Sequence, residues 1–291
     1  MISQVSPSAF TGTQLKWLQL EHNSLTEFPD LRVVSATFGK LFIYRNKISV
    51  IPQELVDGME KLWYIHITWN PLIQIPDFTN VGNKHVHLVI NRTTGIEIGR
   101  EYLCSVGLLR VYYEAGDVPQ LKCDSQATLT HLYMQYRDYD SNTNFTNLIS
   151  AGPNLNELVL DNNNFEEDFP DIPNEVRTRI KYFYVRSASL AYISPVRLEN
   201  FSLNHLNLSD NKLVSVPLKT FNVTKKLMLR KNPWEEFSFN YWQSALCQGY
   251  GNRLNYLDLS ETAENVLQWS IMESAQCLRN IDLHILAYDV S

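Results

Sequence analysis

The sequence predicts a repeat solenoid, in which each copy of a short apolar pattern adds one coil to a shared core. The clearest copy spans residues 203–217, and its frame consists of Leu203, Leu206, Leu208, Asn211, Leu213 and Val216. Only Leu206 and Leu208 alternate, so each copy offers one short strand, followed by a turn and a second apolar contact. A unit of this size cannot bury its leucines alone, and it therefore needs neighbouring copies of itself.

The same frame recurs along the whole chain. Twelve copies begin at Leu15, Phe38, Leu62, Asn83, Leu108, Leu129, Leu155, Ile180, Leu203, Thr224, Leu254 and Leu278. They lie about 24 residues apart on average, which is too short for ankyrin, tetratricopeptide or propeller repeats. We therefore predict one continuous array over residues 1–291, stabilised by the interfaces between neighbouring coils.

In several copies a proline follows the last apolar position, as at Phe28-Pro29, Ile51-Pro52, Ile75-Pro76 and Val216-Pro217. With this feature and its frame, the chain resembles the leucine-rich repeat proteins of the short animal extracellular type over nearly all of its length. The resemblance implies an α/β right-handed solenoid, or horseshoe, with a parallel β-sheet on the concave face and irregular turns or short helices on the convex face. It also implies a non-catalytic module that binds a protein ligand on the concave face, in adhesion, receptor or innate-immune roles.

The asparagine of the frame is expected to bond backbone groups that the tight bend after each strand leaves unpaired. Among the first ten copies, three lack it and carry Gly116, Arg137 or Ala188 instead. Because arginine cannot replace a buried amide at equal cost, we expect this asparagine ladder to be open near Arg137. The polar residues 138–152 that follow predict a longer loop.

Both ends of the array lack an obvious cap. Residues 5–10 look like the tail of an earlier copy, so we expect a fragment that exposes apolar edges and self-associates. The sequence Asn232-Pro233-Trp234 resembles the opening of a cysteine-rich cap, but residues 235–238 contain none of the cysteines that such a cap needs. Because two further copies follow, residues 233–252 are predicted to form an inserted, partly helical segment within the array.

The net charge and the hydropathy of the sequence argue against some classes of binding partner. The net charge of −6 gives no general case for binding nucleic acid, and the 44% hydrophobic content is ample for a core. No apolar run is long enough to insert into a bilayer, and no signal peptide is visible. We therefore expect a protein ligand, and an extracellular or cell-surface location follows only from the resemblance.

Cysteine chemistry leaves two interpretations open. The four cysteines, Cys104, Cys123, Cys247 and Cys277, form no CxxC motif, which argues against a structural zinc site. Their places before the starts of neighbouring copies allow disulfides between Cys104 and Cys123 and between Cys247 and Cys277. The alternative is four buried free thiols, as expected for an intracellular leucine-rich repeat scaffold or adaptor.

Five Asn-x-Ser/Thr sequons occur, at Asn91, Asn144, Asn200, Asn207 and Asn222. We predict Asn144, Asn200 and Asn222 as glycosylation candidates, and Asn144 is the best placed because it lies in the polar loop. Asn91 is a poor acceptor, since its frame position predicts a buried side chain.

The sequence contains no motif that carries catalysis, such as a phosphate-binding loop, a nucleophile elbow, an HExxH sequence or a glycine-rich dinucleotide turn. We therefore predict that the protein is not an enzyme and uses no cofactor and no metal.

The candidate binding residues stand between the inward-pointing positions, so they face out of the predicted sheet. Neighbouring parallel strands are about 4.8 Å apart, and aromatic side chains in these positions would form a contiguous strip. The predicted ligand-binding residues are Phe42, Tyr44, Tyr64, His66, His87, Tyr112, Tyr133, Tyr182 and Tyr184. The alternative is that these rings only pair across strands, as aromatic residues commonly do on pleated surfaces.

Histidine and lysine positions add two weaker hypotheses. All seven histidines lie in variable positions, and His66 and His87 are expected to share one position on neighbouring strands, where they would make binding pH-sensitive or hold a metal adventitiously. The plain alternative is polar surface residues. A basic patch at Lys225, Lys226, Arg230 and Lys231 is either solvated or a contact for an acidic partner.

Overall fold

The structure is a computed structural model. It describes residues 1–81, 86–91, 105–112, 118, 121, 123, 127–136, 138–234, 249, 252–261 and 282–284. The chain divides into two compact units. The first contains Met1–Met134 and Asn147–Leu155, and the second contains Gln135–Thr146 and Asn156–Ser291.

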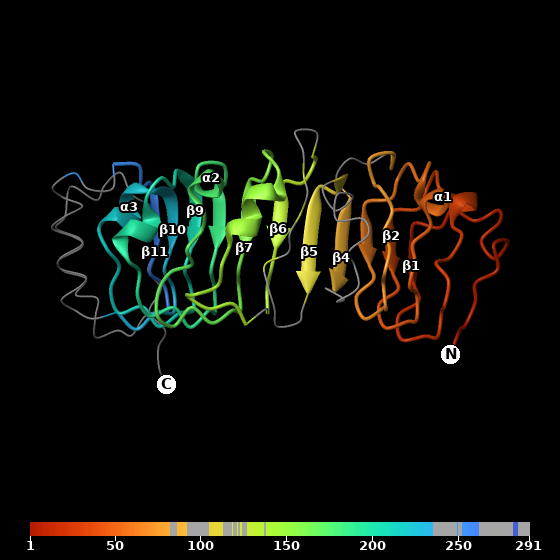
Figure 1. The fold of residues 1–291 in the computed structure, drawn as a ribbon, viewed down its shortest axis with the longest axis horizontal. Helices are drawn as coiled ribbons and strands as arrows, with labels where there is room; N and C mark the ends of the chain where they lie inside the picture. Colours follow the sequence, from red (N-terminus) through yellow and green to blue (C-terminus); the bar gives the residue numbers. More distant parts are fainter. Residues whose placement is uncertain are drawn as a thin grey trace. The chain divides into compact units, whose positions relative to one another are not determined.

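Each repeat contributes one short strand, and the strands of each unit lie side by side in sequence order (Figure 1). The strands of the first unit are β1 (Trp17–Gln19), β2 (Lys40–Phe42), β3 (Tyr64–His66), β4 (His87–Asn91), β5 (Leu108–Tyr112) and β6 (His131–Tyr133). Those of the second unit are β7 (Glu157–Val159), β8 (Tyr182–Tyr184), β9 (Leu203–Asn207), β10 (Thr224–Met228), β11 (Tyr256–Asp258) and β12 (Asp282–His284). Neighbouring strands within each unit pair in parallel, as the repeat predicts.

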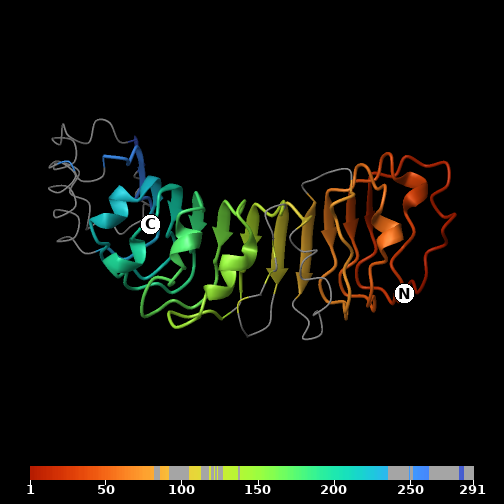
Figure 2. The same ribbon diagram turned by 45° about the horizontal axis from the view of Figure 1, so that its top comes forward.

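Short helices lie on the connections between strands (Figure 2). They are η1 (Arg32–Val34), α1 (Gln53–Val56), η3 (Thr146–Ala151), α2 (Asn174–Arg177), η4 (Pro195–Leu198) and α3 (Lys219–Asn222). Pro52 and Pro173 directly precede α1 and α2, where the fixed φ of proline suits the entry to a helix. The predicted loop over residues 138–152 is wrong in its second half, because η3 forms there with Leu148 and Ala151 fully buried.

The inward positions of the frame form the core, as predicted. Leu41, Ile43 and Ile65 of the first unit have no exposed surface, and neither have Leu206 and Leu208 of the second. Stacking of equivalent positions from coil to coil therefore replaces the burial that a single repeat cannot achieve.

The asparagine ladder is present where the frame asparagine is present. Asn70 donates from Nδ2 to the carbonyls of Ile43 (2.9 Å) and Ile67 (3.2 Å), and its Oδ1 accepts from the Ile48 amide (2.9 Å). The other members with the same pattern are Asn46, Asn211 and Asn232. Each side chain thus forms hydrogen bonds with backbone groups of its own bend and of the preceding coil.

Where alanine replaces the asparagine, a backbone carbonyl accepts the hydrogen bond that the side-chain amide oxygen would otherwise accept. The Phe165 amide donates to the Ala188 carbonyl at 2.8 Å, which takes the place of the missing amide oxygen. The Asn211 Oδ1 then accepts from the amides of Ala188 (2.9 Å) and Leu190 (3.0 Å). The ladder is therefore not interrupted at Ala188, whereas Gly116 and Arg137 lie outside the described residues.

The residue directly before the frame asparagine position has a left-handed backbone in coil after coil. In the first unit these residues are His22 (φ 55), Arg45 (φ 55) and Trp69 (φ 57), and in the second they are Tyr136 (φ 55), Asn162 (φ 57), Ser187 (φ 50), Asp210 (φ 59), Lys231 (φ 54) and Glu261 (φ 57). This conformation suits glycine, asparagine and aspartate, so larger side chains here carry a conformational cost.

Of the predicted insertion over residues 233–252, the structure describes Pro233, Trp234, Gly249 and Asn252. Its partly helical character therefore stays a prediction, as does the continuity of one array over residues 1–291.

Candidate functional site

The strand residues that do not enter the leucine core form what we call the open face of each unit's sheet. In the first unit the strand pairing connects Gln19, Phe42, His66, Val89, Arg110 and Tyr133 in one row, in which Val89 is buried. The neighbouring row contains Trp17, Lys40, Tyr64, His87, Leu108 and His131. Aromatic side chains therefore recur in both rows, as the sequence predicts.

The predicted rows are wrong at two positions. His87 pairs with Tyr64 and not with His66, and Tyr112 pairs with Asn91, two residues beyond the row of Tyr133. The cause is the run of apolar residues around Leu88, because the repeat pattern fits this run in two alignments that differ by two residues. The pairing of Leu88 with Ile65 shows which alignment the structure adopts. His66 and His87 therefore do not share one position on neighbouring strands, contrary to the sequence-based prediction.

Five of the predicted binding residues meet in a continuous network of rings on the first four strands. We call this network the aromatic cluster, and its members are His22, Phe42, Tyr44, Trp63, Tyr64, His66 and His87. Ring centroids are 4.8 Å apart for the stacked pair Tyr44 and His66, and 5.2 Å apart for Phe42 and Tyr64. The remaining contacts of His22, Trp63 and His87 lie between 5.3 and 6.5 Å.

The imidazole of His66 is held in place within the cluster. Its Nε2 lies 2.8 Å from the hydroxyl of Thr68, and one face of its ring stacks on Tyr44. The side chains of Phe42, Tyr64 and His66 remain half-buried on the open face. The cluster therefore presents ordered, partly accessible rings to any ligand on this face.

Trp63 was missed by the sequence-based prediction, because it lies just before β3 and outside the rows that were considered. Its partner in the preceding coil is Gly39, and a Cβ at that position would lie 3.0 Å from the Trp63 Nε1. The available signal was the small residue Gly39 standing one coil before a tryptophan. The space above Gly39 allows the indole to lie against Tyr64 and His87.

Two cations lie over tryptophan rings of this face. The Lys40 Nζ is 4.5 Å from the Trp63 ring centroid, and the guanidinium carbon of Arg45 is 5.7 Å from the Trp69 centroid. Trp17 and Trp69 are the most exposed aromatic residues here, at 64% and 53%. The first unit thus combines exposed indoles with positive charge.

The open face of the second unit is built differently, because it contains a buried carboxylate that is paired with an arginine. Asp161 is 1% exposed, and it accepts from Nε (2.8 Å) and from the backbone amide (2.8 Å) of Arg186. The predicted residue Tyr184 lies under this guanidinium and 5.2 Å from the His205 ring. Burial lowers the pKa of His205, and the positive charges of Lys226 and Arg186 lower it further.

The predicted basic patch is partly neutralised. Arg230 and Lys231 both form ion pairs with Glu261, whereas Lys225 and Lys226 remain exposed. Among the residues that the structure places, no group of three side chains is suited to hold a metal ion. In the same part of the chain no helix combines the length and apolar character needed to cross a membrane.

The remaining predicted binding residues do not join the aromatic cluster. Tyr133 is half-buried on β6, and Tyr182 is half-buried on β8 of the second unit. The Tyr112 side chain lies outside the described residues. In the described residues, the predicted strip therefore consists of two groups. One is the aromatic cluster of the first unit, and the other is Tyr182 and Tyr184 on β8 of the second unit.

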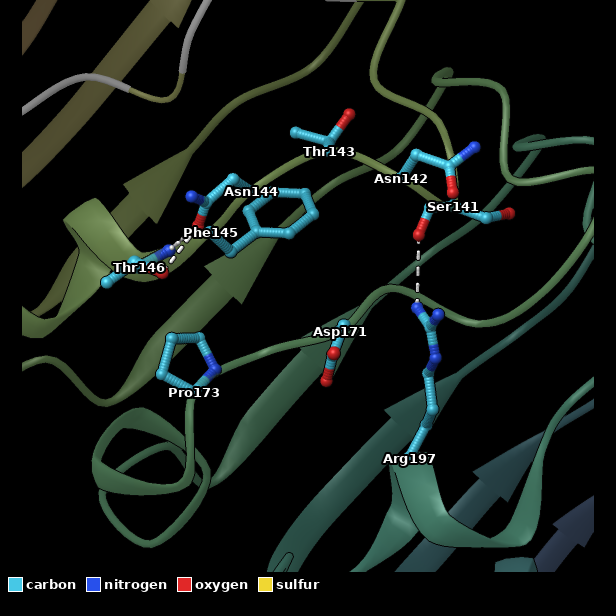
Figure 3. A pocket seen from close by; sticks show the side chains of 9 residues that line it. All are labelled: Ser141, Asn142, Thr143, Asn144, Phe145, Thr146, Asp171, Pro173 and Arg197. Atoms are coloured by element: carbon cyan, nitrogen blue, oxygen red, sulfur yellow. Dashed lines mark hydrogen bonds between the residues drawn. The ribbon is translucent and has the colours of Figure 1, made fainter.

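A polar hollow of about 430 Å³ surrounds the best glycosylation candidate (Figure 3). Its lining includes Asn144, Thr146, Asp171, Pro173 and Arg197. The exposed Asn144 accepts from the Thr146 amide (2.9 Å) and hydroxyl through Oδ1. The Asp171 carboxylate is paired with Arg177 and the Arg197 guanidinium with Asp168, so the hollow presents no nucleophile and base in contact.

The other sequons are less open. Asn200 is exposed, but its Nδ2 donates to the Asn174 Oδ1 at 3.2 Å. Asn222 is half-buried at the end of α3, and Asn207 is buried on β9. The Asn91 side chain lies outside the described residues.

Cys123 is in a disulfide bond. Cys104, Cys247 and Cys277 lie outside the described residues, so the predicted pairing of Cys104 with Cys123 stays a prediction.

No protein-family model matches the chain, and no curated protein matches its sequence. Among solved structures, it is similar to a chain of the octameric complex of latrophilin 3, Unc5D and FLRT2, in which FLRT2 is the leucine-rich repeat component. The TM-score is 0.51 at 17% identity, and the match covers 91% of this chain and 82% of that chain. At this identity the likeness establishes the fold alone.

The recurrent frame, the parallel strands and this likeness together identify the fold as a leucine-rich repeat solenoid. The predicted fold class is confirmed.

Proposed function

We propose that the protein is a non-catalytic recognition module that binds a protein ligand on the open face of its sheet, which corresponds to the concave face of the family. The observation that carries the proposal is the aromatic cluster, whose rings are ordered by one another yet remain accessible. Tyrosine and tryptophan are enriched at binding hot spots, and contiguous exposed aromatic surface tends to mark an interface. The ligand would contact Phe42, Tyr44, Tyr64, His66 and His87.

The proposal predicts that rings of the cluster matter for binding more than for folding. Replacing Phe42 or Tyr64 by alanine should lower partner affinity by about thirtyfold, or about 2 kcal/mol. Because these rings point away from the leucine core, the free energy of unfolding should fall by only about 1 kcal/mol. The partner would be found by screening the multimerised chain against a panel of purified extracellular domains, followed by affinity and melting measurements on each variant.

Tyr192 supplies the matched control, because it is 56% exposed on the connection that follows β8. Tyr192→Ala should change neither affinity nor melting temperature. Early unfolding of Phe42→Ala and Tyr64→Ala would show that the rings are structural, and normal binding by both would place the ligand elsewhere.

We also propose an extracellular or cell-surface location, in an adhesion, receptor or innate-immune role. The support is the disulfide at Cys123 and the accessible sequon at Asn144, both of which suit the secretory route. The alternative is an intracellular scaffold with reduced thiols. Peptide mapping of the unreduced native protein should recover Cys104 linked to Cys123. Recovery of four alkylated thiols would reject both the pairing and the extracellular assignment.

A further inference from the structure

One guanidinium of the first unit, that of Arg45 on the bend after β2, donates to no oxygen among the described residues. The other arginines with described side chains donate to a carboxylate, carbonyl or hydroxyl oxygen of the chain. Arg45 instead is exposed and lies over the Trp69 ring. Its five N–H donors form a planar fork that matches a carboxylate, and this fork is left open to solvent.

Trp69 is placed unfavourably for folding alone. Its backbone is left-handed (φ 57), and its side chain is 53% exposed. In the second unit the same position holds Asn162 and Asp210, which tolerate this conformation, but also Tyr136, Ser187, Lys231 and Glu261. The left-handed backbone costs about 1–2 kcal/mol for most residues, and an exposed indole recovers little of this through burial. Since the left-handed backbone recurs in coil after coil, the exposure of the indole is the feature that points to a contact outside the chain.

The carboxylates of the first 81 residues are segregated from this face. Those on connecting segments are Glu27, Asp30, Glu54, Asp57, Glu60 and Asp77. Of the acidic residues in this range, only Glu21 lies within two residues of a strand, after the end of β1. Lys40, by contrast, is part of β2 and forms no ion pair with the described residues. A chain with a net charge of −6 therefore carries unpaired cations on its aromatic face.

We propose that the open face of the first unit binds a partner segment in which carboxylates stand beside apolar side chains. Two tryptophan–cation pairs, Lys40 with Trp63 and Arg45 with Trp69, would each offer a cation to a carboxylate and a ring to the neighbouring apolar group. The inference rests on the proposed function and adds the chemistry of its ligand.

The first test compares defined probes on the full chain by fluorescence anisotropy. The labelled probes are a glutamate–tyrosine copolymer, a lysine–tyrosine copolymer of the same length, and heparin. The glutamate–tyrosine copolymer should bind at least about tenfold more tightly than the other two, and its affinity should fall as salt rises. Equal binding of the lysine copolymer would overturn the charge argument. Equal or tighter binding of heparin would show a general polyanion site instead.

The second test uses variants of the tryptophan–cation pairs. Arg45→Gln should weaken binding of the glutamate–tyrosine copolymer by about tenfold, because the charge-assisted bond is lost. Lys47→Gln is the control, since Lys47 is an exposed cation beyond Asn46, and it should leave binding unchanged. Equal losses in both variants would overturn the assignment.

Trp69→Asn separates binding from folding. Its copolymer affinity should fall by about tenfold, while its melting temperature stays equal or rises, because asparagine suits the left-handed backbone. A lower melting temperature would show a structural role for Trp69 and reject the inference. If no copolymer binds while Phe42→Ala still abolishes binding to a partner found in the domain screen, the ligand chemistry is wrong and the proposed function stands.

Discussion

Replacing Asn211 by alanine is expected to lower the free energy of unfolding by about 4 kcal/mol. The Asn211 side chain is buried, accepts from the amides of Ala188 (2.9 Å) and Leu190 (3.0 Å), and donates to two carbonyls. Alanine would remove the side-chain bonds of the Ala188 and Leu190 amides and of the Val185 carbonyl, whereas the Leu208 carbonyl would keep its bond from Asn232 Nδ2 (3.0 Å). Since each unsatisfied group costs about 1–3 kcal/mol before relaxation, the loss should exceed that of a typical surface substitution several times over.

Urea denaturation followed by circular dichroism measures this loss, and two further variants sharpen it. Asn164→Ala removes an exposed asparagine two coils earlier and should shift the unfolding free energy by at most about 0.5 kcal/mol. Asn211→Asp keeps the acceptor oxygens but loses both donors, so it should be nearly as unstable as the alanine variant. Equal midpoints for Asn211→Ala and Asn164→Ala would contradict the role of the ladder.

The fold was predictable because its determinants recur. A frame of leucines and one asparagine repeats so often that single deviations cannot change the assignment, and the positions it marks, such as Leu41 and Leu206, are buried. The frame could not predict how the structure compensates for a copy that lacks the asparagine. At Ala188 a backbone carbonyl replaces the amide oxygen, and the sequence carries no signal for this substitution.

The candidate site was predictable only in part, because it depends on register. Phe42 and His66 were placed correctly, since the first copies are regular. His87 was displaced by two residues, because the apolar run around Leu88 fits two frames and the choice is made by packing against Ile65. A shift of two residues keeps a side chain on the same face but changes its neighbours.

The tryptophan–cation pairs could not be found from spacing at all. Lys40 and Trp63 come from neighbouring coils and meet because Gly39 leaves room for the indole. The pairing of Arg45 with Trp69 depends on the left-handed bend that precedes each frame asparagine. Such contacts arise from three-dimensional placement, whereas the linear pattern shows only that aromatic and basic residues are present.

The second large effect is expected at Arg177, a buried cation on α2. Arg177→Ala should lower the free energy of unfolding by about 3 kcal/mol. The guanidinium donates to the carbonyls of Ile172 (2.5 Å), Val196 (3.2 Å) and Glu199 (3.3 Å), and it lies 5.6 Å from the Phe201 ring centroid. These bonds join α2 to the connection of the next coil, so their loss should loosen both.

The ion pair of Arg177 with Asp171 is the smaller contribution, because the Asp171 side chain is 63% exposed and solvent screens the pair. Burial lowers the pKa of Arg177, which is the direction expected for a cation removed from water.

The carbonyl contacts therefore dominate, and Arg177→Lys should recover little stability, since an ammonium cannot reproduce the planar fork. Lys212→Ala is the control, because it breaks only the exposed ion pair with Glu166 and should cost at most about 1 kcal/mol. Chemical denaturation of the three variants decides between these contributions: full recovery by Arg177→Lys would show that charge, and not the geometry of the guanidinium, stabilises this part of the solenoid.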